Sequence, residues 1–106
     1  MHDRERGLER LQAVTGDARE RADVAVGRMF GSEGYSVRGK LFAFVSTDGR
    51  LVVKLPEARI DELGLDNMVM RGRPMREWAA VPYEAGAERW SAIAADALAF
   101  VDEITP

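Results

Sequence analysis

The sequence predicts an α+β fold: a two-layer sandwich in which an antiparallel sheet carries its helices on one face. Three observations support this. Asp48-Gly49 separates two apolar runs, as in a β-hairpin. A strong pattern of helical period begins near Glu84. The 106 residues are enough for one domain over residues 1–106. The expected order is a helix, a three-strand meander, a helix, further strands and a helix.

The N-terminal part is expected to be a helix from Asp3 to about Asp23. Gly16 weakens such a helix by about 1 kcal/mol relative to Ala, so a break near it is allowed. A strand from about Val24 to Phe30 follows, and Gly31–Gly34 is expected to form a turn. The apolar stripe of the helix consists of Leu8, Leu11, Thr15, Ala18 and Ala22.

Two turns define the predicted register of the central strands. Arg38-Gly39 and Asp48-Gly49 are both expected to be two-residue loops, the second of type I′. Side chains alternate across a strand, so this register sorts them into two faces. The predicted core face contains Phe42, Phe44, Leu51, Val53 and Leu55. The opposite face contains Leu41, Ala43, Val45, Val52 and Lys54, and it is unusually apolar for a surface in water.

The second half should add two helices and two short extended segments. Pro56–Leu63 is a predicted helix, with Pro56 at its start and Gly64 just past its end. Met68–Met70 is expected as a short strand or a packed loop, and residues 76–81 as a strand. The last helix should run from about Glu84 to Glu103 and bury its apolar face, including Trp90, against the core face of the sheet.

The residue types exclude several kinds of site. With no cysteine, disulfides, thiolate catalysis and cysteine-held metals are excluded, and His2 is the only histidine. No serine lies in a nucleophile-elbow pattern, and Glu77 is interpreted as a surface strand residue. We therefore expect no catalytic, metal or cofactor site, and no enzyme. No membrane-spanning segment or export leader is found, so the expected location is cytoplasmic.

One local cluster of positive charge is present. Arg71, Arg73 and Arg76 could contact phosphates or an acidic partner, or could form a solvated loop. The net charge of −3 predicts at most weak, salt-sensitive binding to nucleic acid. The glycine-rich GSEG segment lacks the lysine of a phosphate-binding loop and is interpreted as a turn.

Several segments also resemble a known family. RMFGSEGYSVRGKLFAFV, DGRLVVKLP, RPMREW and the VP before the last helix are similar in order and spacing to the TfoX N-terminal domain family, along roughly residues 24–101. The closest similarity is to its short, stand-alone bacterial members. The resemblance implies a two-layer α+β domain, and the family supplies no catalytic residues. Longer members have a further C-terminal domain and regulate competence genes with a transcription activator.

Three function hypotheses follow. The leading one is a non-catalytic regulatory domain that acts through a protein partner linked to transcription. The second is a small-molecule or peptide binding domain that uses the open sheet face, and the third is an enzyme. We also expect a homodimer in which a second copy covers the face containing Leu41, Ala43, Val45 and Val52, with Lys54 pairing across the two-fold axis. The alternative is that the first helix covers this face and gives a three-layer monomer.

Overall fold

The computed structural model describes residues 3–29 and 32–106. In this part of the chain, six strands form one antiparallel sheet in the order β1-β2-β3-β4-β6-β5. The elements are α1 (Asp3–Val14), α2 (Gly16–Glu20), β1 (Val24–Met29), β2 (Ser32–Val37), β3 (Lys40–Val45), β4 (Leu51–Lys54), α3 (Glu57–Glu62), β5 (Asp66–Met70), β6 (Arg73–Val81), the 3-10 turn η1 (Tyr83–Ala85) and α4 (Ala87–Ile104). His2, Phe30 and Gly31 lie outside the described residues.

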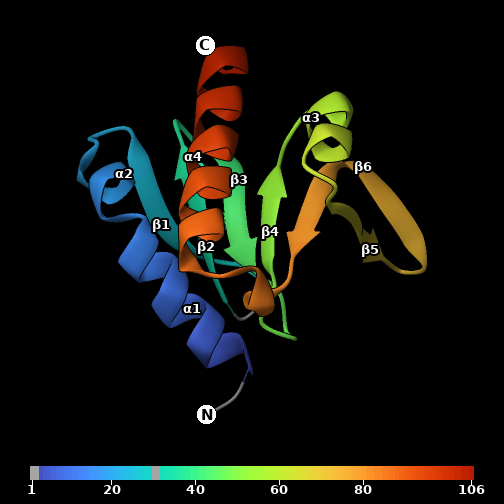
Figure 1. Cartoon of the computed structure of the whole chain (residues 1–106). Coiled ribbons are helices and arrows are strands. Elements are labelled where there is room, and N and C mark those ends of the chain that lie inside the picture. Colours follow the sequence, from blue (N-terminus) through green and yellow to red (C-terminus); the bar gives the residue numbers. More distant parts are fainter. Residues whose placement is uncertain (1–2, 30–31) are drawn as a thin grey trace.

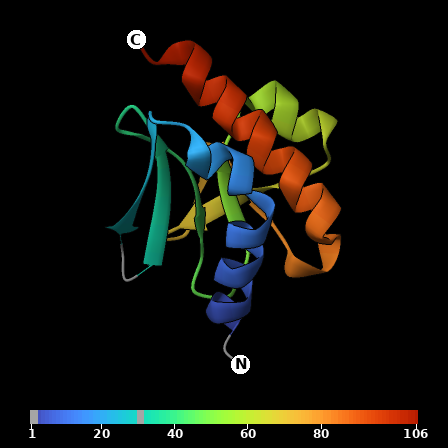
Figure 2. The ribbon, with the colours of Figure 1, turned by 90° about the vertical axis from the view of Figure 1, so that its left-hand side faces the viewer.

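The described helices lie on one face of the sheet (Figures 1 and 2). Helix α4 crosses β3 and β4, α1 packs on α4 and β3, and α3 packs on β6. The arrangement confirms the predicted two-layer α+β fold. The alternative in which the first helix covers the second face is wrong, because Leu11 of α1 is buried in the same core as α4. That core contains Leu11, Tyr35, Val37, Phe42, Ala43, Val45, Leu51, Val53, Leu55, Ile60, Ala79, Val81, Trp90, Ile93, Ala97 and Val101.

The predicted N-terminal helix is broken into two. The Thr15 hydroxyl donates a hydrogen bond of 2.5 Å to the Leu11 carbonyl, and α2 starts at Gly16. A side chain that bonds the preceding turn competes with the main-chain ladder, so the break falls where Gly16 also weakens the helix. The allowed break near Gly16 is confirmed.

The boundaries of the other elements follow the predictions except for three strand extensions and the start of the last helix. That helix starts at Ala87 rather than near Glu84, because Tyr83–Ala85 forms the separate turn η1. Strand β2 starts at Ser32, which pairs with Met29, so the predicted turn Gly31–Gly34 is wrong from Ser32 onward. Strand β5 starts at Asp66, before the predicted Met68–Met70 segment, and β6 starts at Arg73 rather than near residue 76. Residues at both ends of these strands are held by cross-strand pairing, which local sequence patterns do not reveal.

The β3–β4 loop has three residues, and the predicted two-residue Asp48-Gly49 loop is wrong. The Ser46 amide donates to the Arg50 carbonyl at 2.9 Å, and Val45 pairs with Leu51. Only Gly49 takes a left-handed conformation, with φ of +82°, as in a type I turn followed by a bulge. The Arg50 amide also donates to the Ser46 hydroxyl at 3.1 Å, so this serine helps to hold the wider loop.

A β-bulge in β3 changes the register again. Tyr35 pairs with Ala43, but Ser36 pairs with Leu41, so Phe42 is an extra residue in β3. The predicted pairing of Tyr35 with Phe42 is therefore wrong, although Val37 faces Lys40 as predicted. Phe42 and Ala43 are both completely buried in the core.

The loop and the bulge together reassign three side chains. Ala43 and Val45, predicted on the open face, lie in the core. Phe44, predicted in the core, is only partly buried, because its partner is Val52 rather than Val53. Phe44 therefore lies on the face away from the helices.

Arg38 attaches the β2–β3 turn to the C-terminal end of α4. Its Nη2 donates to the carbonyls of Asp102 at 2.9 Å and Thr105 at 2.8 Å. The Asp102 carbonyl also accepts from the Thr105 amide at 3.4 Å, so Arg38 joins the cap at the end of the helix. Its Nη1 lies 2.7 Å from the Asp23 carboxylate and 2.8 Å from that of Asp102. Hydrogen bonds from Arg38 lower the pKa of Asp102, and those from Arg21 lower the pKa of Asp23.

The corrected register predicts unequal effects of two truncations. Phe42→Ala should lower the free energy of unfolding by about 3–5 kcal/mol, because it leaves a cavity in the core. Phe44→Ala should lower it by about 1–2 kcal/mol, because less apolar surface is lost from a half-buried ring. Urea unfolding of both variants measures this. Equal losses, or a larger loss for Phe44→Ala, would show that the register is wrong.

The corner around Arg38 predicts a pH dependence. Asp23 and Asp102 have lowered pKa values in the folded state, so their stabilising effect is complete above the unfolded pKa near about 3.9 and is lost as the pH falls through the folded values. Arg38→Asn keeps a residue type that tolerates the φ of +46°. It removes the pairing of both carboxylates with Arg38 and leaves their pairing with Arg21. Stability should fall less steeply between about pH 5 and pH 2 in the variant. Urea midpoints that change with pH by the same amount in both proteins would contradict this.

Candidate functional site

The sheet face away from the helices, here called the outer face, contains an apolar groove of about 190 Å³. Its side chains come from β3, β4, β6 and β5, which are neighbours in the sheet. This outer groove is lined by Leu41, Phe44, Val52, Met68, Met70, Met75 and Trp78. No charged side chain is among these lining residues.

Two aromatic side chains form the central part of the outer groove. The rings of Phe44 and Trp78 lie 6.0 Å apart at 56°. In the pairing across the sheet, Phe44 is opposite Val52 and Val52 is opposite Ala80. Val52 and Ala80 are only 0% and 2% exposed, although no described helix covers them. The larger side chains around them therefore exclude water from this part of the face.

Strand β6 is irregular near Met75, one of the residues that line the outer groove. Asn67 pairs with Ala79 but Val69 pairs with Pro74, so β6 has three more residues than β5 between these pairs. The Asn67 amide nitrogen donates to the carbonyls of Met75 at 3.0 Å and Arg76 at 3.1 Å. These bonds satisfy backbone groups that the regular ladder would have paired.

Lys54 lies at the rim of the outer groove. Its Nζ is 3.3 Å from the Glu77 carboxylate and 5.3 Å from the centre of the Trp78 ring. Lys54 thus has an acidic partner within its own chain. Glu77 serves as that partner on the strand, in keeping with its interpretation as a surface residue.

A second hollow adjoins the outer groove. It measures about 300 Å³ and shares Leu41 and Trp78 with the groove. It extends to Ile104 at the end of α4, which is 57% exposed. Lys40, Lys54 and Thr105 also line this second hollow, so the path from the β5–β6 hairpin to the C-terminal end of α4 is apolar in the groove and mixed beyond it.

The basic cluster is divided by the structure. Arg71 and Gly72 form a two-residue turn with φ of +53° and +77°, and Met70 pairs with Arg73 across it. Arg71 and Arg73 therefore lie beside Met70 of the outer groove. Arg76 is 3.9 Å from Glu57 at the start of α3, and its side chain is 89% exposed. Within residues 3–29 and 32–106, Arg71 and Arg73 form no ion pair.

The structure divides the predicted interface residues between the two faces of the sheet. Leu41, Val52 and Lys54 lie on or at the edge of the outer face, whereas Ala43 and Val45 are in the core. The residues that the prediction missed are Phe44, Met68, Met70, Met75 and Trp78. A signal was present in the sequence MVMRGRPM: its Arg-Gly pair repeats the Arg38-Gly39 turn, and methionines lie on both sides of it.

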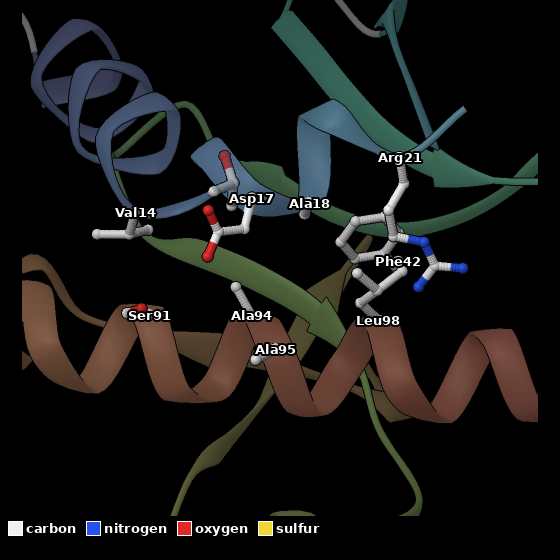
Figure 3. A pocket seen from close by; sticks show the side chains of 10 residues that line it. Val14, Asp17, Ala18, Arg21, Phe42, Ser91, Ala94, Ala95 and Leu98 are labelled. Carbon is white, nitrogen blue, oxygen red and sulfur yellow. The ribbon is translucent and has the colours of Figure 1, made fainter. Parts of the chain in front are cut away.

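Another hollow, of about 290 Å³, lies between α4 and the α1–α2 region, with Phe42 beneath it (Figure 3). Small residues of α2 and α4, such as Ala18 and Ala94, form its sides. The polar groups at its edge include Asp17 and Arg21, and Arg21 is already paired with Asp23. The completely buried Phe42 closes the bottom, so the hollow is a shallow crevice between helices.

The described part of the chain contains no group of three or more His, Asp or Glu side chains placed to hold a metal ion. Among the described helices, none has the length and apolar character needed to cross a bilayer. The sequence matches no protein-family model. A search of curated proteins finds no match either.

The role of Asn67 is testable. Asn67→Ala removes both bonds to the β6 carbonyls and should lower the free energy of unfolding by about 1–2 kcal/mol. Amide hydrogen exchange should quicken mainly in β5 and in the first half of β6, because the effect is local. An unchanged exchange pattern in this hairpin would contradict the role, and Asn67→Ser serves as a milder comparison.

Proposed function

We propose that this protein is a non-catalytic interaction module that binds an apolar segment of a protein partner in the outer groove. The observation that carries the proposal is the outer groove itself, with two aromatic rings and three methionines on a sheet face that no described helix covers. Soluble proteins seldom leave such side chains together without a binding role. Methionine side chains adapt to the shape of a bound apolar group, which suits this task.

The charges beside the groove indicate the chemistry of the partner. Arg71 and Arg73 lie next to Met70 and have no acidic partner in the described part of the chain. A bound segment that places a carboxylate beside them would form charge-assisted hydrogen bonds. The favoured ligand is therefore a short apolar segment followed or preceded by Asp or Glu.

The size of the groove favours a segment over a single small molecule. Small-molecule pockets usually measure about 300–1,000 Å³ and enclose most of the ligand. The outer groove, at about 190 Å³, holds one large side chain, and the adjoining hollow of about 300 Å³ offers a second place. Successive side chains of an extended segment fit such a path. A small-molecule binding domain is the alternative function.

The family resemblance supports the same class of function. Similarity to the TfoX N-terminal domain family favours a regulatory role in a bacterial cytoplasm, through a partner linked to transcription. We also propose a homodimer. The outer face retains only part of the apolar set from which that dimer was predicted, since Ala43 and Val45 are in the core.

Selection of displayed peptides on the immobilised protein tests the proposal. Selected peptides should combine aromatic or aliphatic residues with Asp or Glu. Trp78 is a built-in reporter, because it lines the groove while Trp90 is completely buried. Titration with a selected peptide should therefore change the tryptophan emission.

Matched variants test whether a selected peptide binds in the outer groove and not elsewhere on the protein. Met70→Glu should weaken peptide binding at least about tenfold, a loss of about 1.4 kcal/mol. Val26→Glu is the control, because Val26 of β1 is 41% exposed and Met70 is 40% exposed. Arg73→Glu should weaken acidic peptides more than neutral ones. Equal binding to Met70→Glu and wild type would overturn the proposal, and a metabolite that raises Tm without any peptide ligand would favour the alternative.

A further inference from the structure

Strand β5 is an edge strand with an unusual composition. It lies at the end of the strand order, so one side of its backbone has no neighbouring strand in the described sheet (Figure 1). Proteins usually protect such an edge with lysine, proline or an inward-pointing charge. The four residues of β5 after Asp66 are Asn-Met-Val-Met instead, and Val69 and Met70 are 54% and 40% exposed.

The charges at the two ends of β5 are opposite. Asp66 begins the strand, and Arg71 directly follows it. In the described part of the chain, neither side chain forms an ion pair. Two such strands placed antiparallel bring each Asp66 close to the Arg71 of the other copy. A parallel arrangement would place like charges together, so the charge pattern selects the antiparallel one.

We propose that β5 pairs antiparallel with β5 of a second copy, across a two-fold axis that passes beside Met68. This assignment deepens the homodimer of the proposed function, and it does not depend on which segment the outer groove binds. The two sheets then form one continuous sheet. The outer grooves of the two copies meet at Met68, which lines each of them.

The backbone pattern agrees with this register. Met70 and Arg73 flank a two-residue turn, so the backbone N–H and C=O of Met70 bond to those of Arg73. In an antiparallel strand, successive residues direct their N–H and C=O groups to opposite sides of the strand. The N–H and C=O of Val69, the residue before Met70, therefore point away from β6. The residue opposite Val69 on β6 is Pro74, which has no N–H to offer. Pairing Val69 with Asn67 of the second copy uses these outward groups and places the two Met68 residues opposite each other.

Charge reversal tests this interface. Wild type should dimerise with rising concentration in sedimentation velocity, weakly for a protein interface, because a five-residue strand offers a small contact. Asp66→Arg and Arg71→Asp should each weaken self-association at least about tenfold. Arg71→Asp is compatible with the left-handed backbone at this position, which Asp tolerates. Asp61→Arg, on the exposed surface of α3, is the control and should leave the dimer unchanged.

An equimolar mixture of Asp66→Arg and Arg71→Asp should restore a dimer, because the first strand is then positive at both ends and the second negative. Val69→Pro should abolish dimerisation without unfolding, because it removes only an outward N–H.

The proposal is overturned if wild type stays monomeric up to about 1 mM, if the mixture associates no better than either variant, or if Val69→Pro remains dimeric. Peptide binding by the Val69→Pro monomer should be unchanged, since Val69 does not line the outer groove, so failure of one proposal is distinguishable from failure of the other.

Discussion

The register of β3 is the constraint on which the rest of the structure depends. One extra residue at Phe42 and one extra residue in the following loop decide which side chains enter the core. With them, Phe42, Ala43 and Val45 pack beneath the helices, and Phe44 is turned to the outer face. Without the bulge, the core would lose its largest side chain from this strand, because a shift of one residue reverses every side chain.

The helices depend on that register through the corner at Arg38 and through the β3–β4 loop. Arg38 bonds carbonyls at the end of α4, so the β2–β3 turn and the last helix are held as one unit. At the opposite end, a Cβ built on Gly7 of α1 would lie 2.8 Å from Val45 and 3.0 Å from the Gly49 carbonyl. Helix α1 therefore packs against the hairpin loop at close range, and only glycine fits there.

The sequence was sufficient to predict the layers, the helices and most strands, because periodicity and turn residues are local signals. It predicted Leu41, Val52 and Lys54 on the open face correctly. It could not supply the β3 bulge, because Phe42 and Ala43 are both compatible with either face until Tyr35 is placed opposite. The prediction of Phe44 in the core also depends on the two-residue Asp48-Gly49 loop, which places it opposite Val53 instead of Val52, and with it the centre of the outer groove is missed.

The outer groove and the β5 edge have a common origin in the β5–β6 hairpin. Its Arg71-Gly72 turn fixes Met70 beside Arg71 and Arg73, which form no ion pair with any described residue, and its bulge is held by Asn67. A hairpin that served only to complete the sheet would need neither the bulge nor the methionines. Its apolar residues are exposed on one face and along one edge, and none of the described helices covers either surface. Exposed apolar surface of this kind is costly in water, so its retention on two adjoining surfaces favours association as the purpose of this part of the fold.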